Sequence, residues 1–419
     1  MLYVRLLNRI FIFPLAVYSC AAQSPEKVVV ASVADLQACV DRPAGAPLIC
    51  ALRASSSPYQ VAGAPIIIRR SNTTVEGAAE AGQDPPTLKR MDASLKKLLW
   101  IQKPASDVTI RNLQLDGNST LVPDAGFQDL AAEGSNITVS GVHFGYSASL
   151  AMFFNGPHFS LHDNVLGKLI AGGVSRSAPG TRPGRTAILG WGPRAAQFRL
   201  ESNEVSNYNG AINVNDVPGG TDPAEAGIIE NNKLYHNSIC VPNCGGGQIY
   251  LFGKTTNVKL INNTLDGGWA ESSENRDTLH NYGIEIDGAS YIYTSSNKIF
   301  NHSISGFWIG NGAHHITLEN DTVYNNGLDG VQIAGNGRLA AVSSVSILGI
   351  TSQHNDQHRS PRAPYPTLPR FFGVMIQNNG GSGICIQRDS DLGTNARGDV
   401  YAESSGSFSR AASCPRPYN

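Results

Sequence analysis

The chain has 419 residues, of which 16% are charged, and its formal net charge at pH 7 is −1. This balance gives no electrostatic reason to expect nucleic acid or an anionic membrane surface as a partner. Two or three domains would be ordinary at this length, but a solenoid of stacked repeats grows without a second core, so one elongated domain also fits.

The segment 1–22 is expected to be a secretory signal peptide. Arg5 and Arg9 precede the apolar run IFIFPLAVY, and small residues follow from Ser19. This order is typical of a signal peptide, and the run is much shorter than the roughly 20 residues that span a bilayer. We therefore expect a secreted or periplasmic protein without a stable membrane span. A lipid anchor on Cys20 is the minor alternative.

Six cysteines remain when Cys20 is removed with this segment. An even number in an exported chain indicates disulfides, although reduced and buried thiols are an alternative. Sequence proximity predicts three pairs, namely Cys39 with Cys50, Cys240 with Cys244, and Cys385 with Cys414. No spacing of Cys and His residues indicates a zinc site.

Residues 23–60 are expected to form an N-terminal cap. The amphipathic segment VADLQACVDRP predicts a short helix, and a connection rich in Ser, Pro and Gly follows it. A solenoid needs such a cap because its first coil would otherwise expose the core and an unpaired strand edge. Strands are then expected at about 65–77 and 97–115.

Residues 61–392 are expected to form the solenoid itself, and its repeat is clearest in the second half of this range. Gly283, Gly306 and Gly330 begin the segments GIEIDG, GFWIGN and GVQIAG, at intervals of 23 and 24 residues. Alternation with period two is typical of strands, and its recurrence without a helical period predicts stacked coils. We therefore predict an all-β fold, a single-stranded parallel β-helix of about 9 to 10 coils.

A polar position recurs at one corner of the coils. It is occupied by Asn164, Asn203, Asn232, Asn263, Asn297 and Asp321. Between this column and the next strand, four coils carry insertions, at 167–186, 236–246, 267–282 and 354–372. Since these insertions share a corner, we expect them to wall the adjacent strand face, where recognition loops usually reside; neutral drift is the alternative. Residues 393–419 are expected to be a polar C-terminal tail, tied back by the Cys385–Cys414 bridge.

Every second residue of these strands is expected to point outward, stacked about 4.8 Å from coil to coil. These positions hold two carboxylates, Glu285 and Asp287, among aromatic and amide side chains. Aromatic faces beside amides suit a sugar ring, which has apolar C–H faces and hydroxyl edges. The predicted substrate-binding residues are Trp191, Asn213, Asn215, Tyr250, Phe252, Trp308 and Gln332.

Glu285 and Asp287 are separated by one residue, so their Cα atoms should lie roughly 6.5 to 7 Å apart on the same side of the strand. Two carboxyl groups at that spacing suit the general acid and general base of inverting glycoside hydrolysis. Trp308 is expected to desolvate Glu285 and raise its pKa, which favours Glu285 as the acid. Asp287 is expected to remain wetter, beside Gly310, and to act as the base. Asp216 is a second candidate base.

Other interpretations of the same residues remain open. Paired acids on an exposed strand are often only solvated charge, or ligands of a structural calcium ion together with Asn215 and Asp216. A polysaccharide lyase would instead need a basic residue beside a carboxylate-bearing sugar, and Lys254, Arg276 and His280 are the candidates for this role. Hydrolysis requires no cofactor, and Ca²⁺ is the ion that these acidic residues suggest as a ligand.

The Gly-led strands and the segments NNKLYHN, NNTLDGG, SNKIFNH and NDTVYNN resemble the right-handed parallel β-helix superfamily, the pectin-lyase-like fold. The opening segments DLQACVD and SPYQVAGAPIIIRRSNTTVEG are similar to those of its secreted, polysaccharide-active members. The resemblance covers about residues 30–400 and implies right-handed coiling. The superfamily contains lyases, glycoside hydrolases, epimerases and tailspikes, so the fold does not choose the activity. The Asp-Asp and Gly-His-Gly motifs of polygalacturonases and the Asp-Pro-His-Asp motif of alginate epimerases are absent.

The leading hypothesis is an exported enzyme that cleaves a polysaccharide by hydrolysis with Glu285 and Asp287. The alternatives are a lyase acting on uronic-acid polymers and a non-catalytic protein that binds glycans at a surface. The near-neutral net charge and the acidic groove disfavour a strongly anionic substrate unless a divalent cation bridges it.

Overall fold

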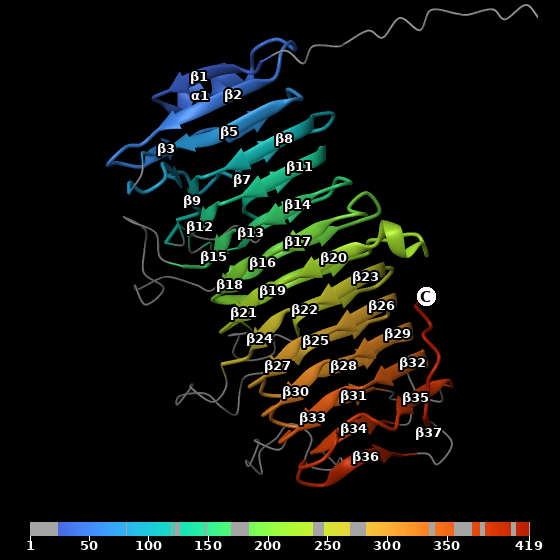
Figure 1. Ribbon diagram of the computed structural model, residues 1–419. Helices are drawn as coiled ribbons and strands as arrows, with labels where there is room; N and C mark the ends of the chain where they lie inside the picture. The colour runs from blue at the N-terminus through green and yellow to red at the C-terminus, as the bar shows by residue number, and fades with distance from the viewer. Residues whose placement is uncertain are drawn as a thin grey trace, which may run out of the picture.

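The computed structural model describes residues 24–80, 82–118, 120–121, 126–145, 147, 149–168, 184–237, 247–268, 282–334, 340–355, 371–377, 382–403 and 408–418. Within these residues the chain forms three parallel sheets of 14, 11 and 12 strands, here named sheets A, B and C. From β2 to β35, successive strands pass from sheet A to sheet B to sheet C and back to sheet A. The coils therefore stack along one axis, from β1 to β37 (Figure 1).

The strands of each sheet have the following bounds. Sheet A contains β1 (Glu26–Val30), β2 (Leu48–Arg53), β5 (Thr73–Ala78), β8 (Ser106–Arg111), β11 (Ser135–Ser140), β14 (Ser160–His162), β17 (Arg199–Glu201), β20 (Gly227–Glu230), β23 (Thr256–Ile261), β26 (Ser290–Ser295), β29 (His314–Glu319), β32 (Ser343–Leu348), β35 (Ile384–Gln387) and β37 (Phe408–Ala411). Sheet B contains β3 (Tyr59–Val61), β6 (Thr87–Arg90), β9 (Gln114–Asp116), β12 (His143–Phe144), β15 (Val165–Leu166), β18 (Glu204–Ser206), β21 (Lys233–Tyr235), β24 (Thr264–Asp266), β27 (Lys298–Phe300), β30 (Thr322–Tyr324) and β33 (Thr351–Gln353). Sheet C contains β4 (Ile66–Ile68), β7 (Lys97–Ile101), β10 (Gln128–Ala132), β13 (Leu150–Phe154), β16 (Gly184–Trp191), β19 (Tyr208–Asn215), β22 (Gly247–Phe252), β25 (Tyr282–Asp287), β28 (Phe307–Gly310), β31 (Val331–Ile333), β34 (Phe372–Ile376) and β36 (Gly398–Ala402).

The solenoid is longer than the sequence pattern indicated. Sheets of 11 to 14 strands among the described residues exceed the expected 9 to 10 coils. The sheets also extend into the segments expected to be cap and tail, since β1 and β2 precede residue 61, β3 begins at Tyr59, and β36 and β37 follow residue 392. Apart from β36, which begins at Gly398, these terminal strands lack the leading glycine by which the central coils were recognised.

Inward side chains of the three sheets form one continuous apolar core. The inward residues predicted for the central strands of sheet C are all 0% exposed, namely Ile212, Val214, Ile249, Leu251, Ile284, Ile286, Phe307, Ile309, Val331, Ile333, Val374 and Ile376. The leading glycines have a steric cause. A Cβ atom on Gly283 would lie 2.3 Å from Cγ2 of Ile299, and one on Gly330 would lie 1.8 Å from Oγ of Ser352. Core side chains of sheet B therefore leave no space for a larger residue at these positions.

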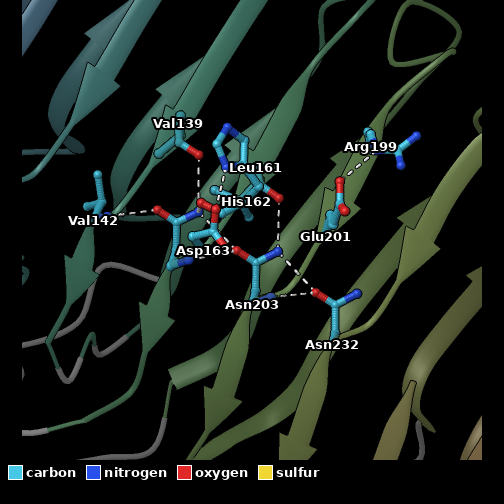
Figure 2. Close-up of polar contacts among 10 residues, drawn as sticks. Val139, Val142, Leu161, His162, Asp163, Arg199, Glu201, Asn203 and Asn232 are labelled. Atoms are coloured by element: carbon cyan, nitrogen blue, oxygen red, sulfur yellow. Dashed lines mark hydrogen bonds and ion pairs between the residues drawn. The ribbon is translucent and has the colours of Figure 1, made fainter. Parts of the chain in front are cut away.

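The predicted Asn column is a hydrogen-bonded ladder at the corner between sheets A and B. In each coil the side-chain amide donates a hydrogen bond to the side-chain oxygen at the same position of the next coil, at 2.8 to 3.0 Å. The members of this ladder, in order, are Asn164, Asn203, Asn232, Asn263, Asn297 and Asp321. The same amide also donates to a backbone carbonyl of the preceding coil, as Asn203 does to Leu161 (Figure 2). The ladder satisfies polar backbone groups that the corner would otherwise bury without partners.

A second ladder, which the sequence analysis missed, lies at the corner between sheets B and C. The backbone N–H of His302 donates to Asn326 at 3.0 Å, and the side-chain amides continue from Asn326 to Asn355 at 2.8 Å and from Asn355 to Asn395 at 3.2 Å. Burial lowers the pKa of His302 to about 4, so this imidazole is neutral in the folded chain.

The helix α1 (Val33–Val40) lies beside the first coil (Figure 1). Ser32 caps it by accepting a hydrogen bond from the N–H of Asp35 at 3.0 Å. The amide of Gln37 bonds both the N–H and the C=O of Ile67, at 2.9 and 3.0 Å, on the end strand of sheet C. Gln37 thereby satisfies the backbone N–H and C=O of Ile67, which have no neighbouring strand at this edge of the sheet. The predicted Cys39–Cys50 disulfide anchors the helix to β2.

The four long connections predicted from the sequence each join a strand of sheet B to the next strand of sheet C, for example β24 to β25. Most of their residues, and the predicted Cys240–Cys244 pair, lie outside the described residues. None of the helices in the described parts of the chain combines the length and apolarity needed to span a membrane.

Residues 412–418 form a C-terminal strap that runs back across the outer face of sheet A, so the end of the chain lies beside β26 and β29 (Figure 1). The predicted Cys385–Cys414 disulfide ties the strap to β35. Arg416 forms an ion pair with Glu319 on β29 at 2.5 Å. The hydroxyl of Tyr418 then donates to Oδ1 of Asn257 on β23 at 2.7 Å.

Removal of the Tyr418 hydroxyl is expected to weaken the strap. Asn257 is 1% exposed and Tyr418 is 5% exposed, so Tyr418→Phe leaves a buried acceptor without its donor. We expect the free energy of unfolding to fall by about 1–3 kcal/mol, measured by urea denaturation. Tyr401→Phe on β36, outside the strap, is the matched control, and an equal loss in both variants would contradict the prediction.

Candidate active site

The outward positions of sheet C hold the residues predicted to act on a substrate. The register aligns Asn213, Tyr250, Glu285, Trp308 and Gln332 across the five strands β19, β22, β25, β28 and β31. A second outward row aligns Trp191, Asn215 and Phe252 across β16, β19 and β22, and Asp287 pairs with Gly310 farther along the same face. The register therefore aligns these residues in rows across sheet C.

Glu285 is half-buried between the strands that carry Tyr250 and Trp308. Its Oε2 atom is buried and has no hydrogen-bond partner among the described residues. Burial, followed by the negative charge of Asp287, raises the pKa of Glu285 to about 7. Glu285 is therefore largely protonated in slightly acidic solution, as a general acid must be.

Asp287 has the opposite environment, since both of its carboxylate oxygens accept hydrogen bonds. The hydroxyl of Tyr250 donates to Oδ2 at 2.9 Å, and the amide of Asn311 donates to Oδ1. These two donors hold the carboxylate in one orientation. Burial, together with the neighbouring Asp287, raises the pKa of Tyr250, so its hydroxyl keeps its proton and remains a donor.

The expectation that Asp287 would be the wetter carboxylate is wrong. Asp287 is 9% exposed, whereas Glu285 is half-buried. The Trp308 side chain lies over Gly310, because a Cβ atom on Gly310 would be 2.3 Å from Cη2 of the indole. Gly310 pairs with Asp287 in the sheet, so the indole lies over the strand position next to Asp287. Hydrogen-bond donors, rather than solvent, contact the carboxylate of Asp287.

Asp216, the second candidate base, is engaged in a turn. Its backbone is left-handed, with φ of 52°, and its Oδ1 accepts a hydrogen bond from the N–H of Lys254 at 3.1 Å. Asp216 follows β19, which β22 separates from the strand of Glu285. Lys254 is exposed in the turn after β22. Arg276 and His280, the other candidates for a lyase, lie outside the described residues.

The predicted sugar-binding residues differ in how far they are available to a ligand. Trp191 and Phe252 are 53% and 39% exposed. Asn213 donates to Thr186 Oγ1 at 3.2 Å, while the Oδ1 atoms of Asn213 and Asn215 are buried without a partner among the described residues. Gln332 is only 4% exposed.

Gln332 contacts two other polar side chains of the protein. Its Oε1 accepts from Ser305, and its Nε2 donates to Gln377, both at 3.4 Å. These contacts engage both ends of the Gln332 amide within the protein. We therefore assign Gln332 a supporting role beneath the outer face of sheet C.

Two residues of the site were missed in the sequence. Asn311, which donates to Asp287, follows the strand in a left-handed turn with φ of 54°, beyond the alternating positions. The ring of Tyr282 lies 6.1 Å from that of Trp308, between centroids. Asn311 ends the segment GFWIGN. An Asn at this position indicates a turn after the strand, because Asn tolerates the left-handed region of the backbone.

A calcium ion at the predicted ligands would compete with protein donors. The hydrogen bonds from Tyr250 and Asn311 occupy both oxygens of Asp287, and the N–H of Lys254 occupies Oδ1 of Asp216. Calcium prefers carboxylate oxygens that are free to coordinate it. At Asp287, therefore, each carboxylate oxygen already has a donor from the protein.

The raised pKa of Glu285 predicts a pH-dependent stability. Its ordinary value is 4.5 and its folded value is about 7, so the folded chain binds more protons between these limits and stability falls as pH rises through them. Glu285→Gln removes this penalty, and we expect it to exceed the wild type in unfolding free energy at pH 8 by about 1–3 kcal/mol.

This prediction is checked by urea denaturation at pH 4 and pH 8, with the exposed Glu225→Gln as the control. The advantage of Glu285→Gln should vanish at pH 4. A difference of the same size at both pH values would contradict it.

Comparisons with known proteins agree with the geometry of the coils. The family model described as "Right handed beta helix region" matches residues 186–351. No curated protein sequence matches the chain. Among solved structures, the Agl-KA catalytic domain has a TM-score of 0.53 at 12% identity, with 90% of this chain and 65% of that chain covered.

Two further solved structures are similar over most of this chain. DFA-IIIase from Arthrobacter chlorophenolicus A6, solved in complex with GF2, has a TM-score of 0.51 at 11% identity, with 89% and 93% covered. The Dettilon tailspike protein gp208 has a TM-score of 0.49 at 13% identity, and the match spans 91% of this chain but only 60% of the tailspike. At these identities the likeness shows the fold alone, and the chemistry has to be argued from the residues of the site.

Proposed function

We propose that this chain, which belongs to the right-handed parallel β-helix superfamily, is an exported enzyme that hydrolyses a polysaccharide on the outer face of sheet C. One observation carries the proposal: a single strand holds two carboxyl groups in opposite environments. Glu285 has a buried, unpaired oxygen and a pKa of about 7, whereas Asp287 accepts two hydrogen bonds. Pairs of carboxyl groups that differ in this way are typical of an acid and a base that act together.

In the proposed reaction, Glu285 donates its proton to the glycosidic oxygen as the bond to the anomeric carbon breaks. Asp287 takes a proton from a water molecule, whose oxygen attacks that carbon from the opposite face. Their Cα atoms are separated by roughly 6.5–7 Å, which suits carboxyl groups that must accommodate this water, so the configuration at the anomeric carbon is expected to invert. Solvent then returns a proton to Glu285 and removes one from Asp287.

Neighbouring residues support these roles. Tyr250 and Asn311 fix the orientation of Asp287. The indole of Trp308 excludes water from the strand beside it. The disulfides Cys39–Cys50 and Cys385–Cys414 favour an oxidising compartment and thus export.

The test is incubation of the full chain with a panel of neutral and acidic polysaccharides, with calcium and with a chelator. New reducing ends and the ultraviolet absorbance of unsaturated sugars are read together. Reducing ends without absorbance are expected. Reducing ends with absorbance would select the lyase alternative, and saturable binding without either signal would select the non-catalytic alternative.

A further inference from the structure

A row of outward residues leads away from the two carboxyl groups along the axis of the solenoid. Trp191, Asn215 and Phe252 are neighbours in the register of β16, β19 and β22, and β25 with Asp287 is the next strand. Among the described residues, four large apolar side chains are at least 39% exposed, and two of them, Trp191 and Phe252, lie in this row. Two exposed aromatic rings on one face indicate a binding surface.

The polar groups beside this row are mainly acceptors. Oδ1 of Asn213 and Oδ1 of Asn215 are buried and lack hydrogen-bond partners among the described residues. Acceptors in this state are stabilised by a ligand that brings donors, such as sugar hydroxyl groups.

No positively charged side chain occurs among the described residues of the two outward rows that hold Trp191 and the carboxyl groups. From β16 to Gln377, the described residues of the two outward rows include no Lys or Arg; they are Leu189, Trp191, Asn213, Asn215, Tyr250, Phe252, Glu285, Asp287, Trp308, Gly310, Gln332, Ala334, Met375 and Gln377. A sugar carboxylate on this floor would meet carboxylates and amide oxygens, which repel it.

The spacing of the row matches an extended sugar chain. Adjacent strands are about 4.8 Å apart, so Trp191 and Phe252 are separated by about 9.6 Å and Trp191 lies about 14 Å from the strand of Asp287. An extended polysaccharide advances by about one strand spacing for each sugar ring. A chain that lies along the axis would therefore present one ring to each coil.

We propose that Trp191, Asn215 and Phe252 bind a neutral, hydroxyl-rich glycan chain that lies along the solenoid axis. Trp191 stacks against a ring about three units from the bond over Glu285 and Asp287, Phe252 stacks against a nearer ring, and Asn215 accepts hydroxyl hydrogen bonds between them. The position of the cleaved bond rests on the proposed function, but binding in the row does not.

The test measures binding rather than cleavage, so that it can fail independently of the proposed hydrolysis. Glu285→Gln is used as the parent chain, and it is run through native gels that contain β-glucan, xylan, mannan, alginate or polygalacturonate at 4 °C. Affinity is calculated from the retardation of the band. Trp191→Ala and Phe252→Ala are compared with Met91→Ala, a matched loss of an apolar side chain that is 41% exposed outside the row.

We expect at least one neutral polymer to retard the parent chain more strongly than either acidic polymer does. Trp191→Ala should weaken that retardation by about tenfold, the size of one lost stacking contact, and Met91→Ala should leave it unchanged. With short oligosaccharides of the same polymer as competitors, Trp191→Ala should weaken the binding of tetramers and longer chains but not of dimers.

Retardation by acidic polymers alone, or by none of the neutral ones, overturns the proposal. Equal retardation of Trp191→Ala and Met91→Ala also overturns it. If Glu285→Gln still degrades the polymer, the proposed hydrolysis fails, while the comparison of the row variants at 4 °C remains valid.

Discussion

Glu285→Gln is expected to reduce the rate of polysaccharide hydrolysis by about 10²–10⁴-fold. The amide keeps the shape of the side chain but has no proton to donate to the glycosidic oxygen. The pKa of Glu285 also predicts how the wild-type rate depends on pH under alkaline conditions. Since a general acid must be protonated, and the pKa of Glu285 is about 7, the wild-type rate should fall as pH rises above about 7. Initial rates of reducing-end formation between pH 4 and pH 9 measure both effects.

A change of leaving group separates the acid from the base. An aryl glycoside with a nitrophenolate leaving group needs little protonation, so Glu285→Gln should lose much less rate on it than on the polysaccharide. Asp287→Asn should lose rate on both substrates, because the attacking water still needs a base. Glu225→Gln is the control for the loss of one carboxylate. Full activity of Glu285→Gln on the polysaccharide would exclude it as the acid.

Asn263→Ala is expected to lower the free energy of unfolding by about 3–5 kcal/mol, near the upper limit for one substitution. Asn263 is 0% exposed. Its amide donates to the carbonyl of Ile229 and to Asn297, both at 2.9 Å, and its Oδ1 accepts from the backbone and side chain of Asn232 at 3.0 and 2.9 Å. Alanine leaves these buried groups without partners, and the corner has no other donor or acceptor in the ladder to replace them.

Urea denaturation followed by circular dichroism measures this loss. Lys233→Ala, an exposed change on the adjacent coil, should alter stability by less than about 0.5 kcal/mol. If the loss in Asn263→Ala is no larger than in Lys233→Ala, the ladder does not stabilise the corner.

The register of the site could be predicted because it depends only on period-two alternation and on a constant coil length. Glu285 pairs with Trp308 and Trp308 with Gln332, as the spacing of Gly283, Gly306 and Gly330 required. The core residues follow from the same alternation. Side-chain direction does not follow from it. The indole of Trp308 extends along its own strand to Gly310, and only three-dimensional packing shows that this direction is open.

The two ladders show the same limit. The first was visible as a column because nearly every member is Asn at a similar distance from the following strand. The second begins at His302 and reaches Asn395 across long connections of unequal length, so no fixed spacing marks it. The contact of Asn311 with Asp287 was missed for a related reason, since Asn311 lies in a turn where alternation ends.

The C-terminal strap changes how the solenoid would respond to tension applied at its C-terminal end. In a simple solenoid each coil contacts only its neighbours, so coils would peel away singly from the pulled end. Here the pull would first separate Tyr418 from β23 and Arg416 from β29, and would then reach Cys414. The disulfide would pass the force directly to Cys385, so β36 and β37, which lie within the covalent loop, would experience no tension.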